Sequence, residues 1–227
     1  MKLSVIMPIY NEKNTLEEIF QKIVAVPIEK EIIMVDDGST DGTRDILKKY
    51  EKLDFVKVIY QKGNFGKGSA IKAGIPHITG DITIIQDADL EYDPNDYLKL
   101  VEPIKDKKEK VIYGSRFINK SNKHSYRSFY LGGLLVSFIT NILYWQKLTD
   151  EPTCYKVFDT ELLKSIKLNC TGFEFCPEVT AKIAKKGIRI KELPINYYPR
   201  TLDEGKKITW KDGLQAIWVL FKYRFVN

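Results

Sequence analysis

The chain has 227 residues, of which 44% are hydrophobic and 12% aromatic, so it can bury a sizeable core, and this composition argues against disorder. Its formal charge of +6 and pI of about 9.0 favour a polyanionic partner: nucleic acid, an anionic membrane or a phosphate-bearing small molecule. The three cysteines have no CxxC spacing and the two histidines lie far from them. This pattern argues against a structural zinc site and fits a reducing cytosol.

Short apolar runs alternate with helical patterns in the first half of the chain. Strands are expected at 3–9, 31–35, 55–59, 82–85 and 111–113, and helices at 15–24, 43–50, 68–75 and 96–104. The first run contains Pro8 and lacks a cleavage site, so it is interpreted as a buried strand and not as a signal peptide. Because the strands are apolar on both faces, the pattern predicts an α/β fold with a Rossmann-like, mostly parallel central sheet flanked by helices.

The second half is less regular. Helices are expected at 128–145, 175–185 and 211–223, and a strand at 188–195. The first of these helices has an apolar stripe, and the last is a C-terminal amphipathic helix. No charge occurs between Arg127 and Lys147, but glycines and polar residues dilute this stretch below the apolar content of a membrane span.

Polar, acidic or glycine-rich clusters follow successive strands, at 10–12, 36–39, 63–68 and 87–89. In an open α/β sheet, ligands bind outside the carboxyl ends of the strands. The four clusters are therefore expected to converge on one edge of the sheet and to form a ligand site there.

The acidic cluster Asp87-Ala88-Asp89-Leu90-Glu91 follows the strand at 82–85. Carboxylates two residues apart on a turn can share a divalent cation, which bridges a diphosphate and stabilises a leaving nucleotide. A solvated acidic turn is the simpler alternative, but the position after the fourth strand favours the metal.

Two adjacent aspartates, Asp36 and Asp37, end the second strand. Thr40 and Asp41 suffice to cap the following helix. Asp36 and Asp37 therefore exceed what capping needs, and we interpret them as acceptors for base N–H groups or ribose hydroxyls.

The glycine-rich segment 63–70 places Lys67 directly before a helix, where free backbone N–H groups favour anions. Its glycine spacing is not that of a P-loop. An ordinary glycine-rich turn explains the segment almost as well.

Together these motifs resemble a known family. They are Pro8-Ile9-Tyr10-Asn11-Glu12, Asp36-Asp37-Gly38-Ser39, Gly66-Lys67-Gly68, Asp87-Ala88-Asp89 and Gly114-Ser115-Arg116. In this order they resemble the family 2 glycosyltransferases of GT-A fold, especially the dolichol- and polyprenol-phosphate sugar transferases. The resemblance implies a single GT-A domain over 1–227, with a nucleotide-sugar-binding half at 1–115 and an acceptor-binding half at 116–227.

The resemblance also implies roles for individual residues. Nucleotide-sugar binding falls to Pro8, Tyr10, Glu12, Asp36, Asp37, Lys67, Asp87, Ala88 and Asp89, and Asp87, Asp89 and Glu91 would hold Mg²⁺ or Mn²⁺. The dolichol-phosphate enzymes tend to have glutamine where Glu91 stands. Asp89 and Arg116 would be catalytic, and the acceptor phosphate would be bound by Arg116, Arg127, Arg200 and Lys206. Lys207 competes with Lys206 for this role.

Mechanistically, family 2 enzymes generally perform one inverting displacement. A lipid phosphate is already an anionic nucleophile and needs positioning more than a base. A sugar hydroxyl would need a base. Glu174 and Glu178 are the spare carboxylates, although a charge at a helix start and a packing contact explain them more simply.

The expected reaction moves a hexose from GDP-mannose or UDP-glucose to polyprenyl or dolichyl phosphate. Six aromatic residues on the 128–145 and final helices look exposed and lie among basic residues: Tyr144, Trp145, Trp210, Trp218, Tyr223 and Phe225. They suit the headgroup region of a membrane, but they suit a dimer interface or an ordinary core equally well. We expect a cytoplasmic protein peripherally bound to the cytosolic face of a membrane, with an anchoring partner or a homodimer as further partners. A saccharide hydroxyl acceptor and a non-catalytic sugar-nucleotide binding protein are the alternatives. No nucleic-acid recognition motif or processive-synthase QxxRW signature occurs.

Overall fold

The computed structural model describes residues 1–123, 126–200 and 209–226. Its centre is a seven-stranded sheet in the order β3-β2-β1-β4-β6-β5-β7. The strands are β1 (Leu3–Ile9), β2 (Lys30–Asp36), β3 (Val56–Tyr60), β4 (Ile82–Ile85), β5 (Val111–Ser115), β6 (Lys156–Asp159) and β7 (Lys191–Pro194). Neighbouring strands run parallel except at β6, which is antiparallel to both β4 and β5. The predicted mostly parallel α/β sheet is thereby confirmed.

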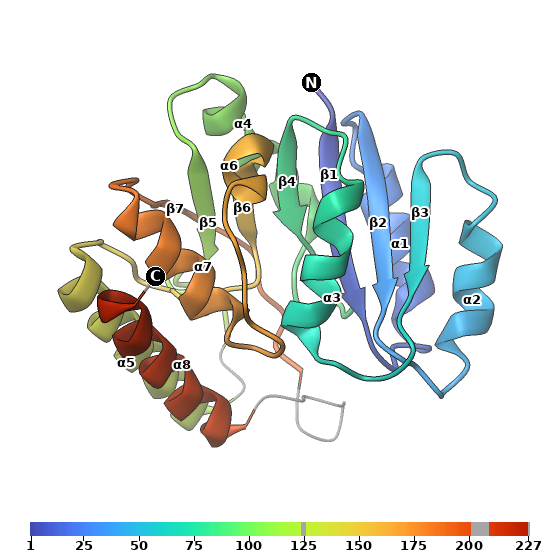
Figure 1. Cartoon of the computed structure of the whole chain (residues 1–227). Helices are drawn as coiled ribbons and strands as arrows, with labels where there is room; N and C mark the ends of the chain where they lie inside the picture. The colour runs from blue at the N-terminus through green and yellow to red at the C-terminus, as the bar shows by residue number, and fades with distance from the viewer. Residues whose placement is uncertain (124–125, 201–208, 227) are drawn as a thin grey trace.

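Helices cover both faces of the sheet. They are α1 (Leu16–Ala25), α2 (Thr43–Tyr50), α3 (Lys67–Gly74), α4 (Tyr97–Lys105), α5 (Arg127–Tyr144), α6 (Thr160–Lys164), α7 (Phe175–Lys185) and α8 (Trp210–Phe225), with 3₁₀ turns η1 (Ile75–His77) and η2 (Pro94–Asp96). Figure 1 shows α1 and α3 on opposite faces of the sheet, because the strand order reverses direction after β3. The carboxyl ends of β1, β2 and β4 consequently open on one edge.

Strand β6 and the short helix α6 were not predicted from the sequence. Lys156 lies at the start of β6 and is fully buried, so the run has no clean apolar pattern. Its Nζ donates to the Glu151 carbonyl at 2.6 Å and lies 3.5 Å from the centroid of the Tyr113 ring. A buried lysine held in this way is invisible to a hydrophobicity pattern. The strand expected at 188–195 is also shorter, because only Lys191–Pro194 pairs with β5.

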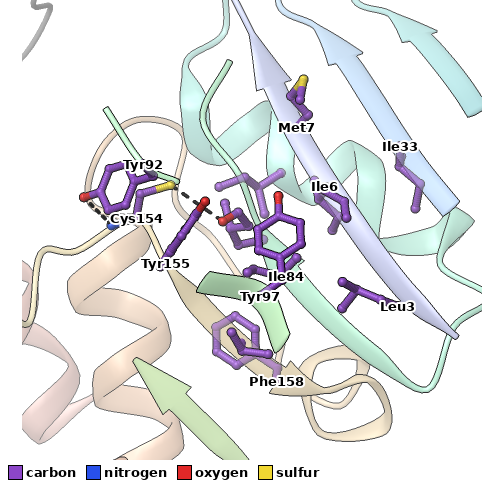
Figure 2. Close-up of a cluster of buried hydrophobic side chains, with 14 of the residues drawn as sticks. Leu3, Ile6, Met7, Ile33, Ile84, Tyr92, Tyr97, Cys154, Tyr155 and Phe158 are labelled. Atoms are coloured by element: carbon purple, nitrogen blue, oxygen red, sulfur yellow. Dashed lines mark hydrogen bonds between the residues drawn. The ribbon is translucent and has the colours of Figure 1, made fainter. Parts of the chain in front are cut away.

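Buried tyrosines fix the turn that follows β4. Tyr92, Tyr97 and Tyr155 pack together, with ring centroids 4.8 Å (Tyr92–Tyr155) and 5.8 Å (Tyr97–Tyr155) apart, beside the apolar side chains of the sheet (Figure 2). The hydroxyls of Tyr97 and Tyr155 lie 2.6 and 2.7 Å from Gln86 Oε1. Gln86 directly precedes Asp87, so the core holds the start of the acidic turn in place.

Helices α5, α7 and α8 pack against one another beside the sheet (Figure 1) and share a second apolar cluster. Tyr144 and Tyr223 belong to that cluster and are buried, so the expectation that they are exposed is wrong. Tyr144 instead donates its hydroxyl hydrogen to the Leu220 carbonyl, which ties α5 to α8. None of the helices within the described residues is long and apolar enough to cross a membrane.

Gly38 lies in the turn after β2, where the edge of the sheet is tightly packed. Its φ is +81°, and an added Cβ would lie 2.5 Å from the Gly63 carbonyl carbon. Gly187 has a similar φ of +75°, but an added Cβ would meet no described atom within 4 Å. Gly187→Ala should cost only the left-handed strain, about 1–2 kcal/mol. Gly38→Ala should cost about 1–3 kcal/mol more from overpacking.

Urea unfolding of both variants measures this difference. Equal losses would contradict the predicted clash, because they would mean that the turn at 63–64 moves aside at no cost.

Candidate active site

A cavity of about 660 Å³ opens at the carboxyl edge of the sheet, and most of the predicted site residues line it. Those that line it are Pro8, Tyr10, Glu12, Asp37, Lys67, Asp87, Ala88, Asp89, Glu91, Arg116 and Arg200. They come from both halves of the chain. The edge predicted from the strand pattern is therefore a real concave surface.

The paired aspartates of the acidic turn are each held by a cation. Lys67 Nζ lies 2.6 Å from Asp87 Oδ1, and Arg200 Nη2 donates to Asp89 Oδ2 at 2.7 Å. Burial, together with repulsion from Asp87 and Glu91, raises the pKa of Asp89 to about 7. Burial alone would lower the pKa of Lys67, but the attraction of Asp87 outweighs it and raises that pKa. The two aspartates thus lie in a strongly charged, poorly solvated cleft.

Both carboxylate oxygens of Glu91 already accept hydrogen bonds. Its Oε2 accepts from the Tyr197 hydroxyl at 3.1 Å and its Oε1 from the Arg200 backbone N–H at 2.7 Å. Across the described parts of the chain, three acidic, histidine or cysteine side chains are nowhere gathered as a metal ion would need. Asp87 and Asp89 still fit Mg²⁺ or Mn²⁺, because these cations take oxygen ligands and leave positions to waters and substrate phosphates. The expectation that Glu91 is a third ligand finds no support in this geometry.

The adjacent aspartates Asp36 and Asp37 have different surroundings. Asp36 is fully buried, accepts from Arg44 Nε at 2.6 Å and from the Gly38 and Ser39 N–H groups, and does not line the cavity. Asp37 lines the cavity and accepts the backbone N–H groups of residues 65 and 66. Asp36 therefore closes the turn, and of the two aspartates only Asp37 faces the cavity.

Several N–H groups of the glycine-rich segment at 63–70 are already bonded within the protein, which leaves fewer of them for an anion than the motif suggests. The N–H groups of residues 65 and 66 bind Asp37, and those of Gly68 and Ser69 donate to the carbonyls of Gly172 and Thr171. An added Cβ on Gly66 would lie 2.5 Å from the Thr171 carbonyl oxygen, so the close approach requires glycine. The segment contributes its Lys67 side chain to the cavity instead.

Arg116 is fixed by an aspartate that sequence reasoning missed. Asp150, fully buried, accepts from Arg116 Nε at 2.7 Å, Nη2 at 2.6 Å and the backbone N–H at 2.9 Å. The guanidinium carbon also lies 5.2 Å from the centroid of the Tyr197 ring. Burial works against the charge, but Asp150 outweighs it and raises the pKa of Arg116. Arg116 therefore presents a fixed positive charge to the cavity.

The other predicted phosphate ligands are less well placed. Arg127 is exposed at the start of α5 and does not line the cavity, whereas Lys206 lies outside the described residues. Glu174 accepts the N–H groups of Thr171 and Gly172. Glu178 accepts those of Asn169 and Cys170 and pairs with Lys182. Both glutamates thus serve local structure, and neither lines the cavity.

Glu151 is a further carboxylate that the sequence did not single out. It is fully buried at the cavity wall, where its Oε1 accepts from the Thr180 hydroxyl at 2.8 Å. Its Oε2 has no hydrogen-bond partner among the described residues, and burial raises its pKa although Lys156 opposes the shift. The one available signal was the adjacent acidic pair Asp150-Glu151 in an otherwise irregular stretch.

Comparison with solved structures defines the fold class as GT-A. The chain aligns over its whole length with glucosyl-3-phosphoglycerate synthase of Mycobacterium tuberculosis in complex with Mn²⁺, UDP and phosphoglyceric acid, at a TM-score of 0.72 and 19% identity, covering 79% of that chain. It aligns over 97% of its length with a mannosyltransferase of Pyrobaculum calidifontis in complex with GDP-Man and Mn²⁺, at a TM-score of 0.61 and 19% identity, covering 72% of that chain. At these identities the likeness concerns the fold.

The chain belongs to glycosyl transferase family 2, whose sequence profile matches residues 4–167. It is 32% identical over 213 residues to dolichol-phosphate mannosyltransferase of Pyrococcus furiosus, an alignment that covers 91% of this chain and 59% of the relative. It is 27% identical to dodecaprenyl-phosphate galacturonate synthase of Rhizobium johnstonii, over 99% of this chain and 68% of the relative. The chain thus spans about three fifths of the length of the archaeal relative.

The pairing of Arg116 with Asp150 predicts a stability effect. Asp150→Asn should lower the free energy of unfolding by about 3 kcal/mol, because it leaves a largely buried guanidinium without its counter-charge. Asp45→Asn breaks an exposed ion pair with Lys48 and should leave that free energy nearly unchanged. Urea unfolding compares them, and equal effects would contradict a structural role for Asp150.

Proposed function

We propose that this protein is an inverting, metal-dependent hexosyltransferase that moves a hexose from GDP-mannose or UDP-glucose to a polyprenyl phosphate. One observation carries the proposal. The cavity that holds Asp87 and Asp89 continues without a break to apolar residues of α5 and α8, among them Leu135, Val136 and Leu214. A donor site and an apolar path in one cavity suit an acceptor with an anionic head and a hydrocarbon tail.

The polar end of the cavity suits a nucleotide sugar. Pro8, Tyr10 and Asp37 lie along the end of the cavity formed by the first two strands and would contact the nucleoside. Asp87 and Asp89 would hold the metal, which supplies a Lewis acid for the diphosphate leaving group. The relatives named for mannosyl and galacturonate transfer, and the structural neighbours with Mn²⁺ and a nucleotide, support this donor class.

Arg116 and Asp89 would carry the chemical step. Arg116, held rigid by Asp150, presents a positive charge that orients the acceptor phosphate for an in-line attack on the sugar's anomeric carbon. A phosphate oxygen is already anionic and needs no general base. The absence of a need for a base agrees with the positions of Glu174 and Glu178, whose carboxylates both accept hydrogen bonds from backbone N–H groups.

The apolar end of the cavity has space beside two glycines. Gly132 and Gly213 line it, and a Cβ added to either would meet no described atom within 4 Å. An isoprene chain fits such a path, whereas a saccharide needs polar groups to bind its hydroxyls. This observation favours the lipid acceptor over a saccharide hydroxyl.

Helices α5 and α8 extend this apolar path onto the surface. Leu131, Leu135, Phe138 and Ile142 on α5, and Trp210, Leu214, Trp218, Phe221 and Phe225 on α8, are all exposed at helical spacing. We call these residues the apolar face. Lys147, Lys211 and Lys222 lie exposed near it. Exposed apolar stripes flanked by basic residues suit an anionic membrane surface, and the protein would take its lipid acceptor there.

Transfer of labelled sugar tests the proposed reaction. With Mn²⁺ or Mg²⁺, GDP-mannose or UDP-glucose should label added polyprenyl phosphate in the organic-extractable fraction. Asp89→Ala should reduce the rate at least ~100-fold, or roughly 3 kcal/mol, because the metal loses a ligand. Asp54→Ala, at an exposed turn, is the matched control and should keep the activity.

Other outcomes would identify other functions. Donor binding without labelled lipid would refute the polyprenyl phosphate, and saccharide acceptors and phosphoglyceric acid should then be tried. Binding of nucleotide sugar with no transfer to any acceptor would favour a non-catalytic binding protein.

The apolar face predicts binding to vesicles. The double variant Leu135→Glu/Trp218→Glu should bind vesicles of phosphatidylcholine and phosphatidylglycerol at least tenfold more weakly in flotation, because it places two charges on the inserting face. Phe55→Glu/Leu98→Glu, at exposed apolar residues elsewhere, should bind like the wild type. A variant that binds normally but dissociates a dimer would assign the face to self-association.

A further inference from the structure

Arg200 joins the two halves of the chain at the acidic turn. Its Nη2 donates to Asp89 Oδ2 at 2.7 Å, its Nη1 to Glu12 Oε2 at 3.3 Å and its backbone N–H to Glu91 Oε1 at 2.7 Å. Its partners are 109 to 188 residues away in the sequence. The guanidinium therefore lies among the carboxylates that a donor and its metal would use.

The contacts of Arg200 leave it incompletely satisfied. Its Nε is buried and has no hydrogen-bond partner within the described ranges, and the contact with Glu12 is long for a charged pair. By comparison, Arg116 donates from Nε, Nη2 and its backbone to one aspartate. Arg116 is thus held in one position by Asp150. Arg200 is held less firmly, so a competing cation can take its place beside Asp89.

The charges of the turn favour such a competitor. The carboxylates of Glu12 and Asp89 both pair with the one guanidinium of Arg200, and Asp87 pairs with Lys67. Carboxylates this close repel one another, so the turn attracts a divalent cation. A divalent cation between Asp87 and Asp89 would take Asp89 Oδ2 away from the guanidinium.

We propose that Arg200 is a resident counter-ion of the donor site, which a divalent metal displaces and which then binds phosphate. The inference rests on the proposed function for the identity of the metal. Once Asp89 turns to the metal, the guanidinium keeps its place at the cavity wall through the backbone bond to Glu91. The N–H groups that Asp89 releases form the planar fork of the guanidinium, which fits two oxygens of a phosphate as well as those of a carboxylate. Metal binding thereby prepares the phosphate site.

The test measures Mn²⁺ binding without nucleotide, by calorimetry and by the loss of the free-ion EPR signal. Arg200→Gln should bind Mn²⁺ at least tenfold more tightly than the wild type, because the competing cation is gone. Arg200→Lys, which keeps the charge but loses the fork, should fall between them. Arg189→Gln changes the net charge equally at an exposed arginine and should bind like the wild type.

A second measurement follows the released arginine with pyrophosphate as the probe. With Mn²⁺ present, the wild type should bind pyrophosphate at least tenfold more tightly than Arg200→Gln. Without Mn²⁺ the two proteins should bind it equally weakly, since Arg200 is then held by Asp89 and Glu12.

The outcomes separate this inference from the proposed function. Unchanged or weaker Mn²⁺ binding by Arg200→Gln would overturn it, even in an active sugar transferase. If that variant binds Mn²⁺ more tightly but the wild type transfers no sugar, the result would support the displacement of Arg200 by the metal and refute the proposed function. If no form of the protein binds Mn²⁺ with or without pyrophosphate, both fail.

Discussion

The structure depends on neutralising carboxylates that the sheet gathers at one edge. Parallel strands end together, so the acidic residues after β2 and β4 lie close to each other in a poorly solvated cleft. A buried carboxylate is costly unless it is paired or hydrogen-bonded. Each aspartate described at this edge accordingly has a cation or a backbone N–H group as its partner, and most of those partners come from distant segments of the chain.

Those partners divide the edge into fixed and exchangeable parts. Asp150 and Arg116 form an ion pair through several hydrogen bonds, and Asp36 accepts from Arg44 and from backbone N–H groups of its own turn. The pairs of Asp87 with Lys67 and of Asp89 with Arg200 are single contacts that face the cavity. Asp36 and Asp150, each held by several hydrogen bonds, build the walls of the site, and the single contacts lie where ligands would enter.

The fold was largely predictable because its dominant signal is local. Strands such as Leu3–Ile9 and Ile82–Ile85 are continuous apolar runs, and a run buried on both faces has few alternatives. Strand β6 escaped prediction because its first residue is the buried Lys156, whose cost is offset by Glu151 and the Tyr113 ring. Tyr113 lies far from Lys156 in the sequence and Glu151 contributes through its backbone carbonyl, so no pattern of side chains reveals this compensation.

The candidate site was predictable in its position and less so in its roles. The strand ends located Asp37, Asp87 and Asp89 correctly on the cavity, as their motifs indicated. The sequence could not separate Asp36 from Asp37, because successive residues at a strand end point in opposite directions and only the fold shows which of them faces the cavity. Asp150 was missed for a related reason: its importance lies in the arginine it holds, 34 residues earlier.

The cavity joins an acidic end, at the carboxyl edge of the sheet, to an apolar end between α5 and α8. An anionic phosphate that arrives along the apolar residues of α5 and α8 meets a cleft whose carboxylates outnumber the cations paired with them. Coulomb repulsion at short range in such a cleft is several times stronger than in water. On the proposed function, an acceptor phosphate would therefore approach most favourably once a divalent cation has neutralised part of the acidic turn. The charge distribution would then favour filling the donor side first, with the lipid tail held along the apolar residues of α5 and α8.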